Sequence, residues 1–115
     1  MKQLTNPVTD YRIALLGDTP DRVFGWIELL NAGKSAGFIY FSSESQVEKP
    51  HLGGNNTYIV MHQPVSMLSN LLSILRVERS LQIRFFDPEA AGVDPTAFLE
   101  TPGTPIGQGE DPRIL

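Results

Sequence analysis

Apolar and aromatic residues gather in short runs along the chain, and segments rich in glycine, proline and asparagine separate these runs. Runs of this length that are rich in β-branched and aromatic side chains are typical of β-strands. The pattern predicts strands at residues 11–16, 23–30, 36–42, 57–62 and 81–86.

The connections between the predicted strands differ in length. The shortest is Asn31-Ala32-Gly33-Lys34, whose residue types suit a turn, and it predicts a hairpin with a bulged or four-residue loop. Residues 17–21 are expected to form a turn, and residues 43–56 a long polar loop. Residues 1–10 are expected to be a polar lead-in to the first strand.

One run has the period of a helix instead. Four leucines recur at intervals of three and four residues, which is the spacing of one face of an α-helix. Pro64 precedes them, and proline suits the first turn of a helix. The run predicts one amphipathic helix over residues 64–78. Its apolar face is also the candidate oligomer interface, formed by Leu68, Leu71, Leu72 and Leu75.

The order of these elements predicts an α+β fold. Consecutive strands joined by turns favour an antiparallel sheet, here of five or six strands in ββββαβ order, with the helix on one face. Residues 97–101 are a candidate edge strand, because Pro102 excludes a long central strand. We expect residues 1–100 to form one domain and residues 101–115 to be an acidic tail, rich in proline and glycine, that is extended or mobile.

Composition narrows the classes of protein that the chain can belong to. A length of 115 residues with 41% hydrophobic residues suits a globular domain that needs no disulfide or metal for stability. The absence of cysteine excludes disulfides, thiolate metal sites and a cysteine nucleophile. With no signal peptide and no apolar run long enough to span a bilayer, we expect a cytoplasmic protein without membrane contact.

Charge is distributed unevenly along the chain. The net charge is −4, and residues 87–115 carry six acidic residues against one basic residue. The preceding part of the chain is therefore close to neutral. Strong non-specific nucleic-acid binders are usually basic, so this balance argues against that class.

The sequence shows no set of residues that assembles catalytic chemistry. Ala32-Gly33-Lys34-Ser35 matches the end of a phosphate-binding loop, but the glycine that should open such a loop is Glu28 and a strand follows. His51 and His62 are the only histidines and lie on different elements, with no carboxylate at ligand spacing. We predict no catalytic residues, no metal ligands and no cofactor, and hence a protein that is not an enzyme.

Aromatic side chains suggest a binding surface. Alternate residues of a strand share one face. Phe38 therefore lies on the same face as Tyr40, and Trp26 lies on the same face as Glu28. If these faces coincide, the sheet could stack bases and hold phosphates. The candidate nucleic-acid-binding residues are Arg12, Trp26, Tyr40, Tyr58, Arg84 and Phe86. The same face could equally be a core or a subunit contact.

The element order over residues 11–78, four strands followed by a helix with Pro64 before it, resembles the PC4/Whirly group of single-stranded nucleic-acid-binding proteins. The resemblance implies assembly through the helix and binding of single strands on a curved sheet. The chain departs from the group because its strands are not basic, it continues into a strand at 81–86, and its tail is acidic.

The sequence leaves three functions open. The first is a non-enzymatic interaction module that is homo-oligomeric, with a dimer favoured, because one helix leaves much of a sheet uncovered. The second is single-stranded nucleic-acid binding on the aromatic face. The third is a small-ligand or enzyme domain that uses the loop at residues 43–56.

Overall fold

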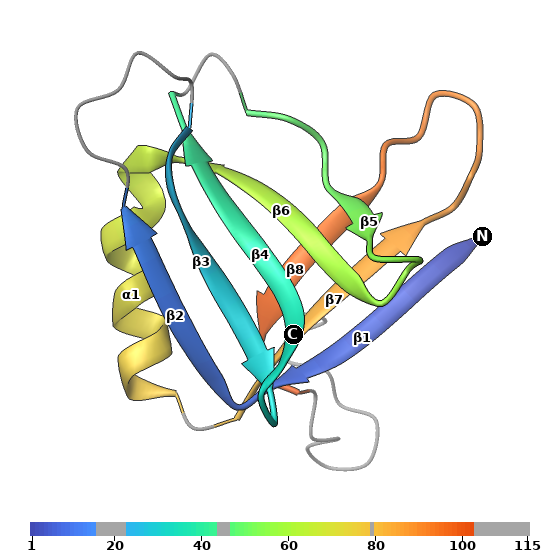
Figure 1. Ribbon diagram of the computed structural model, residues 1–115. Coiled ribbons are helices and arrows are strands. Elements are labelled where there is room, and N and C mark those ends of the chain that lie inside the picture. The colour runs from blue at the N-terminus through green and yellow to red at the C-terminus, as the bar shows by residue number, and fades with distance from the viewer. Residues whose placement is uncertain (16–22, 44–46, 79, 103–115) are drawn as a thin grey trace, which may run out of the picture.

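The computed structural model describes residues 1–15, 23–43, 47–78 and 80–102 (Figure 1). Over these residues the fold is α+β, with one α-helix and eight strands in two sheets. The turn predicted at residues 17–21 lies outside the described residues. So does the predicted tail beyond residue 102.

The two sheets share the strands unevenly. Sheet A is antiparallel and has the order β1 (Lys2–Val8), β7 (Leu81–Asp87), β8 (Thr96–Glu100). Sheet B is mixed and has the order β2 (Asp10–Leu15), β3 (Val23–Asn31), β4 (Lys34–Ser42), β6 (Tyr58–Pro64), β5 (His51–Gly53). The single antiparallel sheet expected from the sequence is thus divided in two, and the strand at 96–100 is an edge strand as expected.

The pairing of β4 with β6 is parallel, not antiparallel. Parallel neighbours need a long crossover connection, and the segment between β4 and β6 is long enough to provide one. Part of that segment, expected to be loop, forms the short strand β5, which pairs with β6 in antiparallel orientation.

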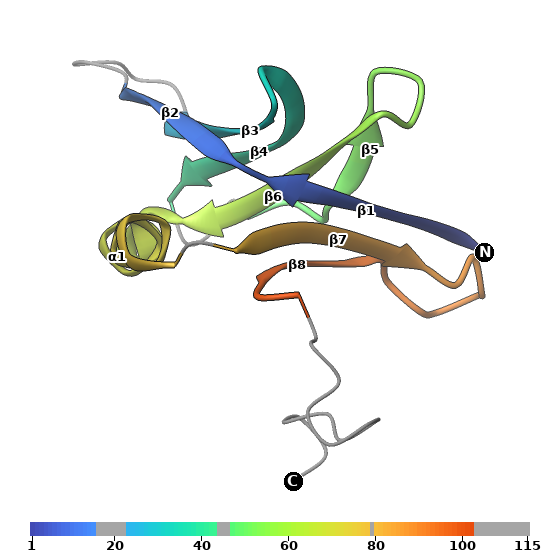
Figure 2. The ribbon, with the colours of Figure 1, turned by 90° about the horizontal axis from the view of Figure 1, so that it is seen from below.

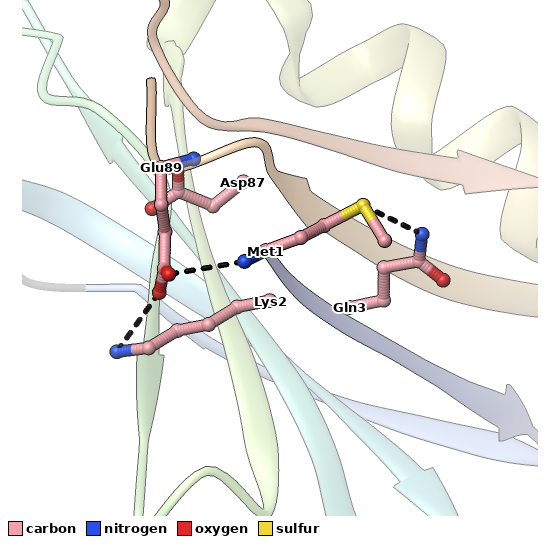
Figure 3. A network of polar contacts seen from close by, with 5 residues as sticks. All are labelled: Met1, Lys2, Gln3, Asp87 and Glu89. Carbon is pink, nitrogen blue, oxygen red and sulfur yellow. Dashed lines mark hydrogen bonds and ion pairs between the residues drawn. The ribbon is translucent and has the colours of Figure 1, made fainter. Parts of the chain in front are cut away.

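Residues 2–8 form β1, so the expectation of a polar lead-in is wrong. β1 pairs with β7 over its whole length and is an edge strand of sheet A, the position where a strand tolerates Pro7. Figure 3 shows how its first residues are held: the Met1 amino group lies 3.0 Å from a Glu89 carboxylate oxygen, and the Lys2 ammonium lies 3.9 Å from the other.

The core lies between the two sheets, which form two layers in Figure 2. Its fully buried large side chains come from alternate positions of four strands: Ile27, Leu29, Ile39, Phe41, Ile59 and Ile83. A 3-10 turn at Val65–Met67 leads into α1 (Leu68–Val77), which lies at one end of the layers. Leu71 and Leu75 of α1 are each only 7% exposed and belong to the core.

The β3–β4 hairpin closes through a tight turn. Asn31 pairs with Lys34, so the loop has two residues, Ala32 and Gly33, both at positive φ. Such a turn matches the twist of the strands it joins. The pairing shifts register between Leu29 and Leu30, so the bulge expected from the sequence is present and the four-residue loop is not.

Asn6 links the two sheets. Its side-chain amide donates hydrogen bonds to the carbonyl of Ala36, at 2.9 Å, and to the carbonyl of Thr57, at 3.0 Å. The chain then crosses from sheet A to sheet B at Thr9, whose backbone N–H donates to the Leu30 carbonyl at 2.7 Å. These hydrogen bonds join the end of β1 and the residue after it to sheet B.

We expect Asn6→Ala to lower the free energy of unfolding by about 1–2 kcal/mol, because a partly buried hydrogen bond to Ala36 and an exposed one to Thr57 are lost. Thr5→Ala, on the exposed neighbour of Asn6, should change stability by less than about 0.5 kcal/mol. Urea unfolding of the three proteins measures the difference. Equal stabilities of the two variants would show that Asn6 does not join the sheets energetically.

Candidate binding surface

Aromatic rings form a continuous surface on the face of sheet B that points away from sheet A. Tyr40 is central, because the pairing of β4 places it beside Trp26 on one side and His62 on the other. The ring centroids of Tyr40 and Trp26 are 6.0 Å apart, and those of Tyr40 and His62 are 5.7 Å apart. Aromatic pairs at such distances attract one another beyond their buried area.

The surface extends in both directions along the strands. Phe38 lies 6.0 Å from Tyr40 and meets the ring of Tyr58 edge-on at 5.2 Å. His51 of β5 stacks on His62 with centroids 5.7 Å apart. We call this surface the aromatic face, and its members are Trp26, Phe38, Tyr40, His51, Tyr58 and His62. His51 is exposed and the other five are partly exposed.

Two glycines hold Tyr58 in place. A Cβ atom on Gly53 would lie 2.4 Å from the Tyr58 ring, and one on Gly54 would lie 2.5 Å from it. Gly54 also has a φ of +57°, which few other residues adopt. The ring therefore packs directly on the backbone between β5 and β6, and side chains at these positions would push it out of the aromatic face.

The charges on this face are paired with each other. Glu28 accepts a hydrogen bond from the Ser35 hydroxyl at 2.5 Å and from the Arg12 guanidinium at 2.7 Å. These bonds, with that from Ser35 contributing most, lower the pKa of Glu28, and burial opposes them. Arg12 and Glu28 lie opposite each other in the β2–β3 pairing. The face is therefore aromatic with one compensated ion pair beside it.

The pKa values of two side chains in the aromatic face, Tyr40 and His62, are shifted. Burial raises the pKa of Tyr40, and the nearby Tyr58 and Glu28 add to this effect. Burial lowers the pKa of His62, Glu48 acts in the opposite direction, and His51 lowers it further. Tyr40 and His62 are therefore both uncharged near neutral pH, which keeps the centre of the face neutral.

His62 occupies an unusual position. Its Nε2 is buried and makes no hydrogen bond with any residue that the structure describes, and it lies 3.8 Å from a carboxylate oxygen of Glu48. The same histidine lines a pocket of about 330 Å³ between β6, β8 and the segment before β5. His62 therefore lies at the boundary between the aromatic face and this pocket.

The structure does not bring the six candidate nucleic-acid residues onto one surface. Trp26, Tyr40 and Tyr58 belong to the aromatic face, and Arg12 lies beside it. Arg84 and Phe86 belong to sheet A. Arg84 binds the Glu100 carboxylate through two bonds of 2.8 and 3.0 Å, and its guanidinium lies 4.6 Å from the centre of the Phe98 ring.

Sequence reasoning left three members of the aromatic face out of the candidate set, namely Phe38, His51 and His62. The alternation of Phe38 with Tyr40, and of His62 with Tyr58, was the signal for two of them. His51 gave no such signal, because β5 was not expected. The candidate oligomer residues Leu71 and Leu75 lie in the core, and Leu68 and Leu72 pack against it.

Among the described residues, no group of three or more histidine, aspartate or glutamate side chains is placed to hold a metal ion. No helix in this part of the chain has the length and apolar character needed to cross a membrane. Comparison with known proteins found no matching family model, no matching curated protein and no matching solved structure.

Because Nε2 of His62 is buried, we expect the stability of the fold to depend on pH. Because the pKa of His62 is lowered in the folded chain, the unfolded chain takes up the proton first as pH falls. Stability should therefore decline as pH falls below about 6.5, the ordinary value for histidine, and should level off below the lowered pKa. Urea unfolding midpoints across this range measure the effect.

Two variants isolate the contribution of His62 from other titrating groups. His62→Phe keeps a ring beside Tyr40 and should reduce the decline. Glu48→Gln removes the charge that favours protonated His62, so it should make the decline steeper. If His62→Phe shows the same pH dependence as the unaltered chain, burial of His62 is not its source.

Proposed function

We propose that this chain is a non-enzymatic interaction module that binds a second copy of itself through the aromatic face. The observation that carries the proposal is the unbroken set of ring contacts across β3, β4, β6 and β5. Aromatic side chains are enriched, and charged ones depleted, at the centres of protein interfaces. They also supply most of the residues whose truncation costs binding energy.

The charge of the face supports self-association. Two copies of a chain with net charge −4 repel each other unless they meet on a neutral surface. The aromatic face meets this condition, because Arg12 and Glu28 compensate each other and burial favours neutral His62. A two-fold symmetric pair would bring the aromatic face of one copy against the same face of the other, and this symmetry is the commonest one among homo-oligomers.

Single-stranded nucleic acid is a second candidate for the same face. Trp26 lies opposite Ala14 in the β2–β3 pairing, so the side of its ring toward β2 has no aromatic neighbour on the strand it pairs with. A base could stack there. Arg12 is exposed and pairs with Glu28, two residues from Trp26, so its guanidinium could approach a phosphate of the same strand. The acidic balance of the whole chain favours the first candidate.

Sedimentation velocity from low micromolar to near-millimolar concentration tests self-association. We expect Tyr40→Thr, which removes the central ring but keeps a strand-forming residue, to raise the dissociation constant by about tenfold or more. Phe98→Thr is the matched control, because it removes an exposed ring from sheet A. A chain that stays monomeric throughout, or a loss of association caused equally by Phe98→Thr, would contradict the proposal.

The fluorescence of Trp26 separates the two candidates, because it is the only tryptophan. Self-association should change its emission as protein concentration rises, with little dependence on salt. Nucleic-acid binding should quench it when an oligonucleotide is added, most strongly at low salt, since phosphate contacts weaken as salt increases. If the emission responds only to oligonucleotide, nucleic-acid binding replaces self-association as the function of the aromatic face.

A further inference from the structure

A pocket opens where the two sheets separate beside their edge strands. It lies between the C-terminal half of β6 and the first residues of β8, and residues 47–50 close it on a third side. Its volume of about 330 Å³ is within the range of sites for small ligands, which begins at about 300 Å³. The pocket is separate from the aromatic face except at His62, which lines it.

The walls of the pocket are mainly apolar. Met61 of β6 and Ala97 of β8 form its inner side, and Phe98, 41% exposed, borders it from sheet A. A pocket with such walls favours a ligand with an aliphatic or aromatic body. The polar groups of the pocket determine which functional group a ligand with such a body must carry.

Two of these polar groups are hydrogen-bond acceptors that lie close together. The Glu48 carboxylate is an acceptor only, and neutral His62 accepts through Nε2 when Nδ1 carries the proton. The two atoms are 3.8 Å apart, too far to bond to each other. Nε2 of His62 is buried, so a ligand in the pocket reaches the Glu48 carboxylate directly and meets His62 as part of the wall.

The charges around the pocket favour a cation. Glu48 is exposed over 73% of its side chain and belongs to the pocket lining. Two cations of neighbouring segments are paired with other carboxylates, since Lys49 lies 2.9 Å from Asp94 and Arg84 binds Glu100. An anionic ligand would meet the Glu48 carboxylate without compensation, whereas an ammonium group would neutralise it.

We propose that this pocket is a binding site for small protonated amines with an apolar or aromatic body. The ammonium group bonds to the Glu48 carboxylate beside His62, and the body of the molecule lies against Met61, Ala97 and Phe98. Hydrogen bonds to charged groups are stronger than neutral ones, so the amine contributes specificity as well as affinity. The proposal does not rest on the function proposed for the aromatic face, although His62 belongs to both regions.

Three probes of similar size test the proposal: phenethylamine, which is cationic, 3-phenylpropionate, which is anionic, and 2-phenylethanol, which is neutral. Methyl resonances of Met61 and Ala97, followed by NMR during titration at neutral pH, report binding in the pocket. We expect phenethylamine to bind more tightly than the alcohol by about tenfold and the anion not to bind.

Variants show whether the named groups hold the amine. Glu48→Gln should weaken phenethylamine binding by about tenfold while leaving the affinity for 2-phenylethanol nearly unchanged. Glu89→Gln removes an exposed carboxylate elsewhere and is the matched control.

The outcomes are distinct. Selective shifts of Met61 and Ala97 by the amine, lost in Glu48→Gln alone, support the proposal. Equal binding of the three probes, equal effects of the two glutamate variants, shifts confined to the aromatic face, or no binding at millimolar concentration would each overturn it. A failure here would leave self-association untouched, since that is measured without any ligand.

Discussion

The packing of sheet A on sheet B is the contact on which the rest of the structure depends. The sheets approach closely where Ile83 of β7 meets Gly37 of β4: a Cβ atom on Gly37 would lie 2.8 Å from Ile83 and 2.7 Å from the carbonyl oxygen of Ile59. This approach buries one face of each sheet. Because side chains alternate along a strand, the aromatic residues at the intervening positions of β3, β4 and β6 must face outward.

The aromatic face and the amine pocket both follow from this arrangement. The aromatic face is the outer side of sheet B, and the pocket lies between β6 of sheet B and β8, an edge strand of sheet A. His62 contributes to both, since its ring stacks on Tyr40 and its Nε2 lies near Glu48. An occupant of the pocket would contact the same histidine that packs in the aromatic face, so the two sites share a side chain although they use different chemistry.

Burial changes the chemistry of this region more than charge does. The histidine is held neutral by its surroundings, and the tyrosine beside it is held protonated for the same reason. The ion pair beside the face, between Arg12 and Glu28, is completed by the Ser35 hydroxyl at the start of the neighbouring strand. A neutral aromatic surface on an acidic chain is the property from which we infer the interaction function.

The sequence by itself determined the local elements: the hairpin around Gly33, the helix after Pro64, the edge strand before Pro102 and the α+β class. Period and turn chemistry are local properties, so they can be read from neighbouring residues. Only the tertiary structure decided that residues 2–8 pair with β7, that β4 and β6 run parallel, and that Arg84 lies on a different sheet from Tyr40. These are pairings between distant segments, which are selected by how the two layers bury their apolar faces together and leave no mark on the residues around them.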